Sequence, residues 1–190
     1  VYCLPDGYQG CGTSRDLSLA EIDTLVAAFA GKGTEKIRLT GGEPTLQAAL
    51  ADALAAVRAL GMQTALHTAG MYPQRLAALL PQLDWVGLDI KAPAHRHDAI
   101  TATPGSAGRP RQALRALADS GIDFECRTTW HPGLFSASEL LALADELRAS
   151  GVTCWAVQEC RTPAAPAWTL TPEQIRQLGA GFERFTLRRA

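Results

Sequence analysis

The sequence lacks the features that mark several classes of protein. No apolar run approaches the roughly 18 residues of a transmembrane helix, no signal peptide opens the chain, and low-complexity tracts are absent. Neither sign of charge is in excess, because 18 basic residues face 19 acidic ones and the formal net charge is −1. That balance gives no electrostatic reason to expect a nucleic acid or an anionic membrane as partner. The Arg188-Arg189 pair at the end is interpreted as a fraying tail.

Motifs of common hydrolases and nucleotide-binding proteins are also absent. The sequence contains no G-x-S-x-G turn, no P-loop and no H-E-x-x-H, which excludes the commonest hydrolase and phosphate-binding classes. His95 and His97 flank Arg96 in a predicted surface loop, and no third ligand is nearby. We therefore do not expect a metal ion to bind these histidines.

Five cysteines are present, an odd number that does not suit a secreted disulfide framework. We therefore expect a cytoplasmic protein, with Cys126, Cys154 and Cys160 as small buried side chains. The chain begins with Val1 rather than methionine and reaches Cys3 almost at once, which is typical of a sequence cut at its start.

Helical and strand patterns alternate along the chain. Strands are expected at residues 36–40, 62–66, 85–90, 122–129 and 152–157. Helices are expected at about residues 18–29, 45–60, 72–80 and 136–150, and two more are expected, one that ends at about residue 121 and one that begins at residue 171. Helix starts carry capping signals at Ser18, Ser136 and Thr171, and three helices end in a glycine that precedes a strand. Repeated helix-glycine-strand units predict an α/β protein with a parallel sheet, either open or curled into a barrel. We expect one domain over residues 1–190.

Polar or glycine-rich residues follow four successive predicted strands. Parallel α/β folds bind ligands at the carboxyl ends of their strands, so these segments predict a common site. They are residues 40–44, 67–70, 89–91 and 127–131.

The turn after the first predicted strand allows a ligand to approach the backbone closely at Gly41 and Gly42. Glu43 then stands at a helix start, where it either accepts a hydrogen bond from an ammonium group or only favours the helix dipole.

The other strand ends carry ionisable groups. Asp89 and Lys91 are two residues apart, so both can point to one face, as an ion pair or as ligand-binding groups. Arg127 lies in an apolar strand and requires a buried partner or an anionic ligand group. His67 is interpreted either as a core histidine that donates to a backbone carbonyl or as part of the site.

Tyr2-Cys3 and the following Gly41-Gly42-Glu43-Pro44 turn resemble the radical S-adenosylmethionine (SAM) superfamily, whose signature is C-x-x-x-C-x-x-C. By this resemblance Cys3 is the third cysteine of the signature and a ligand of a [4Fe-4S] cluster, and the first two would precede Val1. Cys11 does not match the loop spacing. The resemblance implies a partial (β/α)6 TIM-like barrel that lacks its first strand. The cofactor-binding residues it implies are Tyr2, Gly41, Gly42, Glu43, Pro44, His67, Asp89, Lys91 and Arg127.

Two parts of the chain resemble different members of the superfamily. Residues 2–8 and 33–44 are similar to the GTP 3′,8-cyclases of molybdenum-cofactor synthesis. Residues 67–70, 84–93, 103–106 and 125–132 are similar to anaerobic ribonucleotide-reductase activating proteins, in which the positions of Asp89, Lys91 and Arg127 contact SAM. His67 stands where several activating enzymes carry an acidic residue.

The second similarity covers more of the chain. It implies a glycyl-radical activating enzyme that acts on an anaerobic ribonucleotide reductase and receives electrons from a flavodoxin- or ferredoxin-type donor. The alternatives are a GTP 3′,8-cyclase-like enzyme and a truncated, catalytically inert barrel. Cys154 and Cys160 are not spaced like the second cluster of a cyclase, which counts against GTP as substrate.

Overall fold

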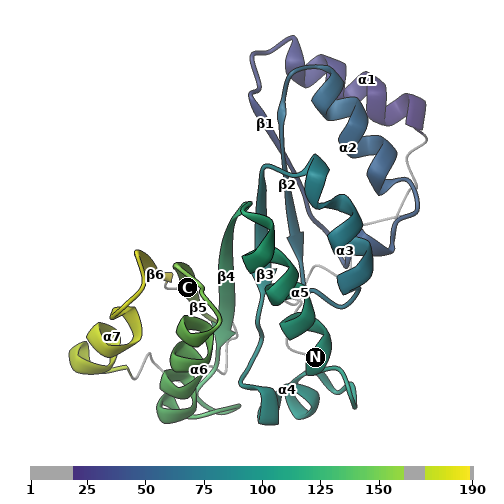
Figure 1. Cartoon of the computed structure of the whole chain (residues 1–190). Helices are drawn as coiled ribbons and strands as arrows, with labels where there is room; N and C mark the ends of the chain where they lie inside the picture. The colour runs from purple at the N-terminus through teal and green to yellow at the C-terminus, as the bar shows by residue number, and fades with distance from the viewer. Residues whose placement is uncertain (1–18, 161–169, 189–190) are drawn as a thin grey trace.

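Six parallel strands form one sheet in the order β1-β2-β3-β4-β5-β6 in the computed structural model, which describes residues 19–160 and 170–188 (Figure 1). The strands are β1 (Lys36–Leu39), β2 (Gln63–Thr68), β3 (Trp85–Asp89), β4 (Asp123–Trp130), β5 (Cys154–Glu159) and β6 (Arg184–Arg188). The helices are α1 (Leu19–Ala30), α2 (Leu50–Ala59), α3 (Pro73–Leu79), α4 (Ala94–Thr101), α5 (Gly108–Ser120), α6 (Ala137–Ala149) and α7 (Pro172–Gly179), with short 3₁₀ turns η2 (Pro44–Leu46) and η3 (Leu80–Gln82). The predicted α/β class is confirmed.

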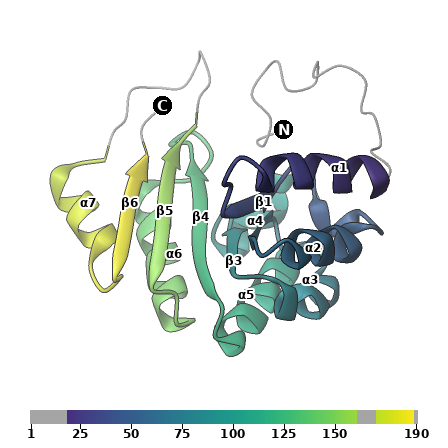
Figure 2. The same cartoon turned by 90° about the horizontal axis from the view of Figure 1, so that it is seen from above.

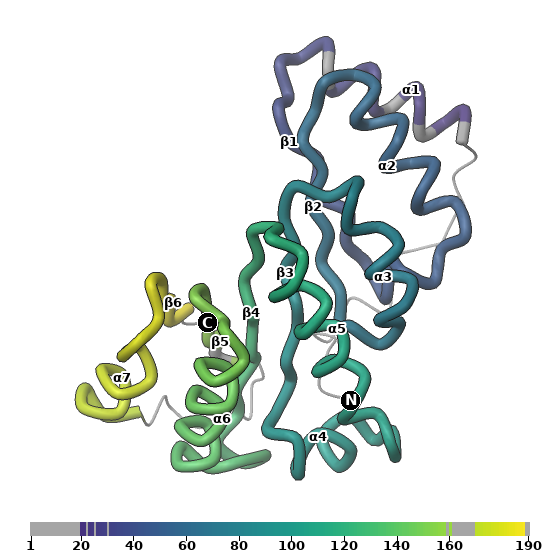
Figure 3. The backbone as a smooth tube through the Cα atoms, in the orientation of Figure 1, coloured from purple at the N-terminus to yellow at the C-terminus, as the bar shows by residue number. Residues whose placement is uncertain are grey.

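The sheet is curved, and its outer side carries most of the helices (Figures 1 and 2). The backbone runs from β1 at one edge to β6 at the other, and these two edge strands do not pair with each other (Figure 3). The six strands of the described residues therefore form a partial barrel. No helix of the described residues combines the length and apolar character needed to cross a bilayer.

Side chains along each strand alternate between the outer and inner faces. In β3, Val86 and Leu88 point outward and are fully buried against the helices, whereas Trp85 and Asp89 lie on the inner face. The same alternation in β4 buries Cys126 on the outer side and leaves Arg127 on the inner side. The main core therefore lies between the sheet and the outer helices.

The capping signals are confirmed where the structure describes them. Ser136 and Glu139 form a reciprocal capping box at the start of α6, and Thr171 and Gln174 form another at α7. The glycines before β2, β4 and β5 have left-handed φ angles of 75°, 73° and 77°, as expected for residues that end a helix; they are Gly61, Gly121 and Gly151. Ser18 lies outside the described residues.

The helix expected at 45–60 begins later than predicted. Pro44 starts only a 3₁₀ turn, and Gln47 then adopts an extended conformation before α2 begins at Leu50. Arg75 of α3 donates to the carbonyl oxygens of Thr45 at 3.0 Å and Leu46 at 3.3 Å. These carbonyls therefore bond to α3 instead of continuing a helix.

Two elements were not predicted. Residues 94–101 form α4 rather than a loop, and His97 is buried there with its Nδ1 3.1 Å from Ser106 Oγ. Residues 184–188 form β6, so the interpretation of Arg188 as part of a fraying tail is wrong. Strand β2 also extends to Thr68, so that His67 lies inside the strand and not beyond its end.

Gly70, which follows β2, provides a test of the packing between the sheet and α5. Its φ is +68°, and an added Cβ would lie 2.8 Å from Leu88 Cδ1 and 2.9 Å from Ala113 Cβ. Gly61 has a similar φ of +75°, but an added Cβ there meets no atom within 4 Å. We expect Gly61→Ala to cost about 1–2 kcal/mol of unfolding free energy through backbone strain alone. Gly70→Ala should cost about 1–3 kcal/mol more because of the clash.

Urea denaturation of both variants measures this difference. Equal losses of unfolding free energy in the two variants would contradict the close approach of α5 to the end of β2.

Candidate functional site

The carboxylate of Glu43 ties the turn after β1 to the end of β2. Its Oε1 accepts hydrogen bonds from Thr45 N at 3.2 Å, Thr45 Oγ1 at 2.6 Å and Thr68 Oγ1 at 2.7 Å, and its Oε2 accepts one from Ala69 N at 2.8 Å. We call Glu43, Thr45, Thr68 and Ala69 the Glu43 clasp. Because Oε2 has only this one donor among residues 19–160 and 170–188, these residues leave it an acceptor position for a ligand ammonium group.

The two glycines before Glu43 form an open turn. Gly41 has a φ of +133°, a conformation that favours glycine, and no atom lies within 4 Å of a Cβ built at Gly41 or Gly42. A ligand can therefore approach the backbone of this turn. Pro44 is buried at the start of the 3₁₀ turn.

The ionisable residues of β3 and β4 form a connected row on the inner face. Asp89 and Arg127 are register partners, and Asp89 Oδ1 accepts from Arg127 Nε at 2.9 Å and Nη2 at 2.6 Å. Lys91 Nζ lies 3.7 Å from the other Asp89 oxygen. Arg127 Nη1 bonds to His67 Nδ1 on β2. Asp89 is thus the partner that Arg127 requires, and the expected ion pair between Asp89 and Lys91 is present.

His67 is held in one protonation state by these neighbours. An arginine can only donate, so the bond from Arg127 requires an unprotonated Nδ1 on His67 and leaves the proton on Nε2. Burial, together with the charges of Arg127 and Arg38, lowers the pKa of His67 from 6.5 to about 4. Its Nε2 is buried and has no hydrogen-bond partner among residues 19–160 and 170–188. His67 is therefore a neutral donor and does not donate to a backbone carbonyl.

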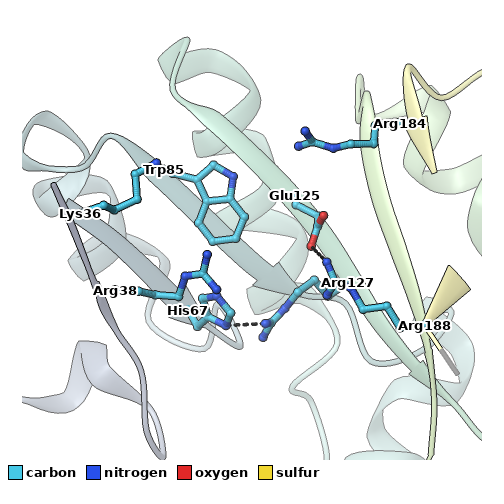
Figure 4. Close-up of a pocket in the computed structure, with 8 residues that line it drawn as sticks. All are labelled: Lys36, Arg38, His67, Trp85, Glu125, Arg127, Arg184 and Arg188. Carbon is cyan, nitrogen blue, oxygen red and sulfur yellow. Dashed lines mark hydrogen bonds and ion pairs between the residues drawn. The ribbon is translucent and has the colours of Figure 1, made fainter. Parts of the chain in front are cut away.

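The inner face also contains a cavity of about 340 Å³ (Figure 4). Trp85 lies on one side of it and packs against His67, with ring centroids 5.5 Å apart. An added Cβ at Gly87 would lie 2.8 Å from the Trp85 ring, so a larger residue there would require the ring to move. Five cationic side chains line the cavity, namely Lys36, Arg38, Arg127, Arg184 and Arg188, together with Glu125.

The structure thus brings together most of the predicted site residues. Thr68 of the Glu43 clasp is next in sequence to His67. His67 contacts Arg127, which in turn bonds to Asp89. Thr68 was expected only as a member of the segment 67–70, and six residues that line the cavity were not predicted as site residues, namely Lys36, Arg38, Trp85, Glu125, Arg184 and Arg188. Alternating polar and apolar residues at 36–39 and 184–188 were a signal for strands with one charged face.

The predicted cluster ligand Cys3 and its neighbour Tyr2 lie outside the described residues, as does Cys11. Among the residues that the structure describes, no group of three or more His, Cys, Asp or Glu side chains could hold a metal ion. Cys126 is buried on the outer side of β4, and burial raises the pKa of its thiol, so it is not suited to ligate iron. The described residues therefore do not supply the cluster site.

The model of the radical SAM superfamily matches residues 1–147 of the chain. The chain belongs to the radical SAM superfamily. Enzymes of this superfamily use a [4Fe-4S] cluster and SAM.

Similar curated proteins are GTP 3′,8-cyclases. The cyclase of Pectobacterium atrosepticum is 42% identical over 131 residues, which cover 66% of this radical SAM chain and 38% of the cyclase. The cyclase of Stenotrophomonas maltophilia strain K279a is 50% identical over 78 residues, which cover 40% of this chain and 24% of the cyclase. The chain therefore spans well under half the length of these relatives.

Similar solved structures confirm the radical SAM fold of the partial barrel. Streptococcus suis SuiB bound to the precursor peptide SuiA has a TM-score of 0.69 and 14% identity, covering 90% of this chain and 43% of that one. A domain of the pyruvate-formate lyase-activating enzyme from Bacteroides vulgatus has a TM-score of 0.65 and 16% identity, covering 80% of this chain and 97% of that one. At these identities the likeness concerns the fold alone.

The residues of the site fit the polar end of SAM. The open Gly41-Gly42 turn and Glu43 Oε2 offer acceptors for an amino group, and Lys91 and Arg127 offer positive charge for a carboxylate.

Thr68 tests the Glu43 clasp. Thr68→Val keeps the shape of the side chain but removes the donor to Glu43 and the acceptor for Gly70 N, which lies 3.0 Å from the hydroxyl. Because Thr68 is buried, we expect a loss of about 1–3 kcal/mol in unfolding free energy. SAM affinity, measured by calorimetry, should also fall. Thr68→Ser retains the hydroxyl and should restore both quantities, and a Ser variant as impaired as the Val variant would contradict the clasp.

The pKa of His67 predicts a dependence of stability on pH. Its folded value of about 4 lies below 6.5, so the unfolded chain binds more protons between these values. The free energy of unfolding should therefore decrease as pH falls through this window, and the decrease should be smaller in His67→Gln. Burial also lowers the pKa of His97, so part of the decrease should remain.

Urea denaturation at about pH 7.5 and pH 5 measures the effect. His95→Gln is the control, because the side chain of His95 is 64% exposed. An unchanged pH dependence in His67→Gln would show that His67 is not held neutral by its neighbours.

Proposed function

We propose that this chain binds SAM at the Glu43 clasp and the His67–Arg127–Asp89 row and generates a radical from it. A reduced [4Fe-4S] cluster, when bound, would supply the one electron needed for cleavage of the sulfonium C5′–S bond to methionine and a 5′-deoxyadenosyl radical, which would take a hydrogen atom from the substrate. The residues of this chain bind and orient the methionine end of SAM. Gly41, Gly42 and Glu43 accept from its amino group, and Arg127 and Lys91 face its carboxylate.

The observation that carries this proposal is the continuity of the site across three strands. Asp89 occupies one side of the Arg127 guanidinium and His67 another, so the orientation of Arg127 is determined before a ligand binds. The clasp in turn positions the glycine turn against the strand that carries His67. A site held in this way loses little conformational entropy on binding.

For the substrate, we propose the glycyl radical site of an anaerobic ribonucleotide reductase, with a flavodoxin- or ferredoxin-type electron donor in the cytoplasm. The similarity of residues 67–70, 84–93 and 125–132 to activating proteins supports this proposal. These residues contribute His67, Asp89, Lys91 and Arg127 to the site.

A second candidate is a GTP 3′,8-cyclase-like activity. The observation that favours it is the 42% identity to the Pectobacterium cyclase over 131 residues, a span longer than the first 44 residues that resemble cyclases most. Both candidates use the same SAM site and differ only in the acceptor of the radical.

Arg127 provides the test of the SAM site. We expect Arg127→Gln to weaken SAM binding by about tenfold or more, because it removes a charged donor and leaves Asp89 and His67 without their shared partner. Arg115→Gln, an exposed arginine of α5, is the matched control and should bind SAM normally. Calorimetry measures binding, and 5′-deoxyadenosine formation after anaerobic reconstitution with iron and sulfide measures cleavage.

Two further measurements on the reconstituted chain identify the radical acceptor. A glycyl radical signal in the electron paramagnetic resonance spectrum of the reductase supports the activating enzyme. Turnover of GTP without that signal supports the cyclase and overturns our first proposal. Normal SAM affinity in Arg127→Gln would contradict the site itself.

A further inference from the structure

The turn that carries Glu43 is attached to the protein at a second point, beyond the clasp. Arg75 of α3 places one terminal nitrogen, Nη1, 3.0 Å from the carbonyl oxygen of Thr45 and 3.3 Å from that of Leu46. Because Nη1 carries two N–H bonds, it donates to both oxygens at once. Thr45 is therefore held on both sides, since its amide and hydroxyl bond to Glu43 while its carbonyl bonds to Arg75.

The 3₁₀ turn η2 needs a donor of this kind at its end. It has only three residues, and Gln47 is extended directly after it, so no helix continues from the carbonyls of Thr45 and Leu46. Carbonyl groups at the end of a helix have no partner within that helix and must find one elsewhere. Arg75 supplies charge-assisted hydrogen bonds, which are stronger than those between neutral groups.

The guanidinium of Arg75 is itself held in place, although the residue is exposed. Its central carbon lies over the ring of Tyr72, the N-cap residue of α3, at 5.3 Å from the ring centroid. The face of an aromatic ring attracts a cation, and stacking restricts the many rotamers of a free arginine side chain. We call the contacts of Arg75 with Tyr72, Thr45 and Leu46 the Arg75 brace.

The clasp and the brace come from one short segment of the chain. The end of β2 binds the carboxylate of Glu43, and α3, the next helix along the chain, carries Arg75. This helix lies on the outer side of the sheet (Figure 1). A turn that is attached at one point can pivot about it, whereas a turn attached at two points keeps one orientation. The segment from β2 to α3 therefore holds the turn at both ends.

We propose that Arg75 is a positioning residue, which holds the turn from Gly41 to Glu43 in the shape that receives SAM. This inference rests on the proposed function, which assigns the ligand of the turn. Arg75 belongs neither to the Glu43 clasp nor to the row on the inner face, and it acts only through the turn. A turn that already has its bound shape loses little conformational entropy when the ligand binds. Loss of Arg75 therefore weakens SAM binding and does not slow cleavage once SAM is bound.

Hydrogen exchange of the chain without SAM tests the brace directly. In Arg75→Gln we expect the amides of Thr45 and Ala69, which both donate to Glu43, to exchange at least about fivefold faster than in the unmodified chain. Arg115→Gln, which removes an exposed arginine from α5, is the matched control and should exchange like the unmodified chain. Unchanged exchange of both amides in Arg75→Gln would overturn the proposal.

SAM binding by the same variants tests the positioning role. We expect Arg75→Gln to raise the Kd of SAM by about five- to tenfold in calorimetry. The maximal rate of 5′-deoxyadenosine formation at saturating SAM should stay within about twofold of the unmodified chain. A lower maximal rate with an unchanged Kd would contradict the positioning role. An unchanged Kd in a variant whose turn exchanges faster would also contradict it, because the brace would then be purely structural.

Tyr72 provides an independent set of variants. Tyr72→Leu removes the ring beside the Arg75 guanidinium and should weaken SAM binding, and Tyr72→Phe keeps the ring and should restore the affinity. In the Arg75→Gln background, Tyr72→Leu should cause no further loss, because the ring acts only through the guanidinium. Additive losses of affinity in the double variant would contradict the brace.

These measurements distinguish failure of the positioning role from failure of the proposed function. If the unmodified chain binds no SAM, the proposed function is wrong, and hydrogen exchange, which needs no SAM, still decides whether Arg75 holds the turn. If SAM binding depends on Arg127 but not on Arg75, the proposed function stands and the positioning role is wrong.

Discussion

Every strand of the curved parallel sheet directs alternate side chains toward the outer helices and toward the inner face, and the rest of the structure depends on this constraint. In β3 it buries Val86 and Leu88 while it places Trp85 and Asp89 on the inner face. One short segment therefore contributes both to the core and to the site. A shift of the register by a single residue would bury Asp89 and expose the apolar side chains, so stability and function select the same register.

The Glu43 clasp joins the turn after β1 to the end of β2. Glu43 was expected either to accept a hydrogen bond from an ammonium group or only to favour the helix dipole; its carboxylate accepts four hydrogen bonds from the protein and so determines the shape of the turn. In the proposed SAM site, Glu43 therefore both positions the Gly41-Gly42 turn and keeps one acceptor position for the ligand. The row from His67 to Lys91 behaves similarly, because each charged group orients the next. Preorganised polar groups of this kind are effective because they need not reorganise when the ligand binds.

Much of the fold was predictable from local signals. Glycines at helix ends, capping boxes and the apolar run of β3 are short-range features, and the structure confirms them at residues 85–89 and 136–149. The errors occurred where distant groups decided the local structure. Arg75 binds the carbonyls of Thr45 and Leu46 and so delays α2, and the pairing with β5 forms β6 from a segment that was interpreted as a tail. Local propensity cannot report either interaction, because each joins residues that are far apart in the sequence.

The sequence by itself determined the α/β class, the superfamily and the four segments that carry the candidate SAM site, because these depend on periodicity and on short motifs. Only the tertiary structure decided the chemical state of those residues. It made His67 a neutral donor through Arg127, and it made Glu43 a clasp through Thr68 and Ala69. It also brought Lys36 and Arg38 to face Arg184 across one cavity, although the whole chain is nearly neutral. Net charge is a sum over the chain, whereas the charge of a cavity depends on which side chains the curvature of the sheet brings together.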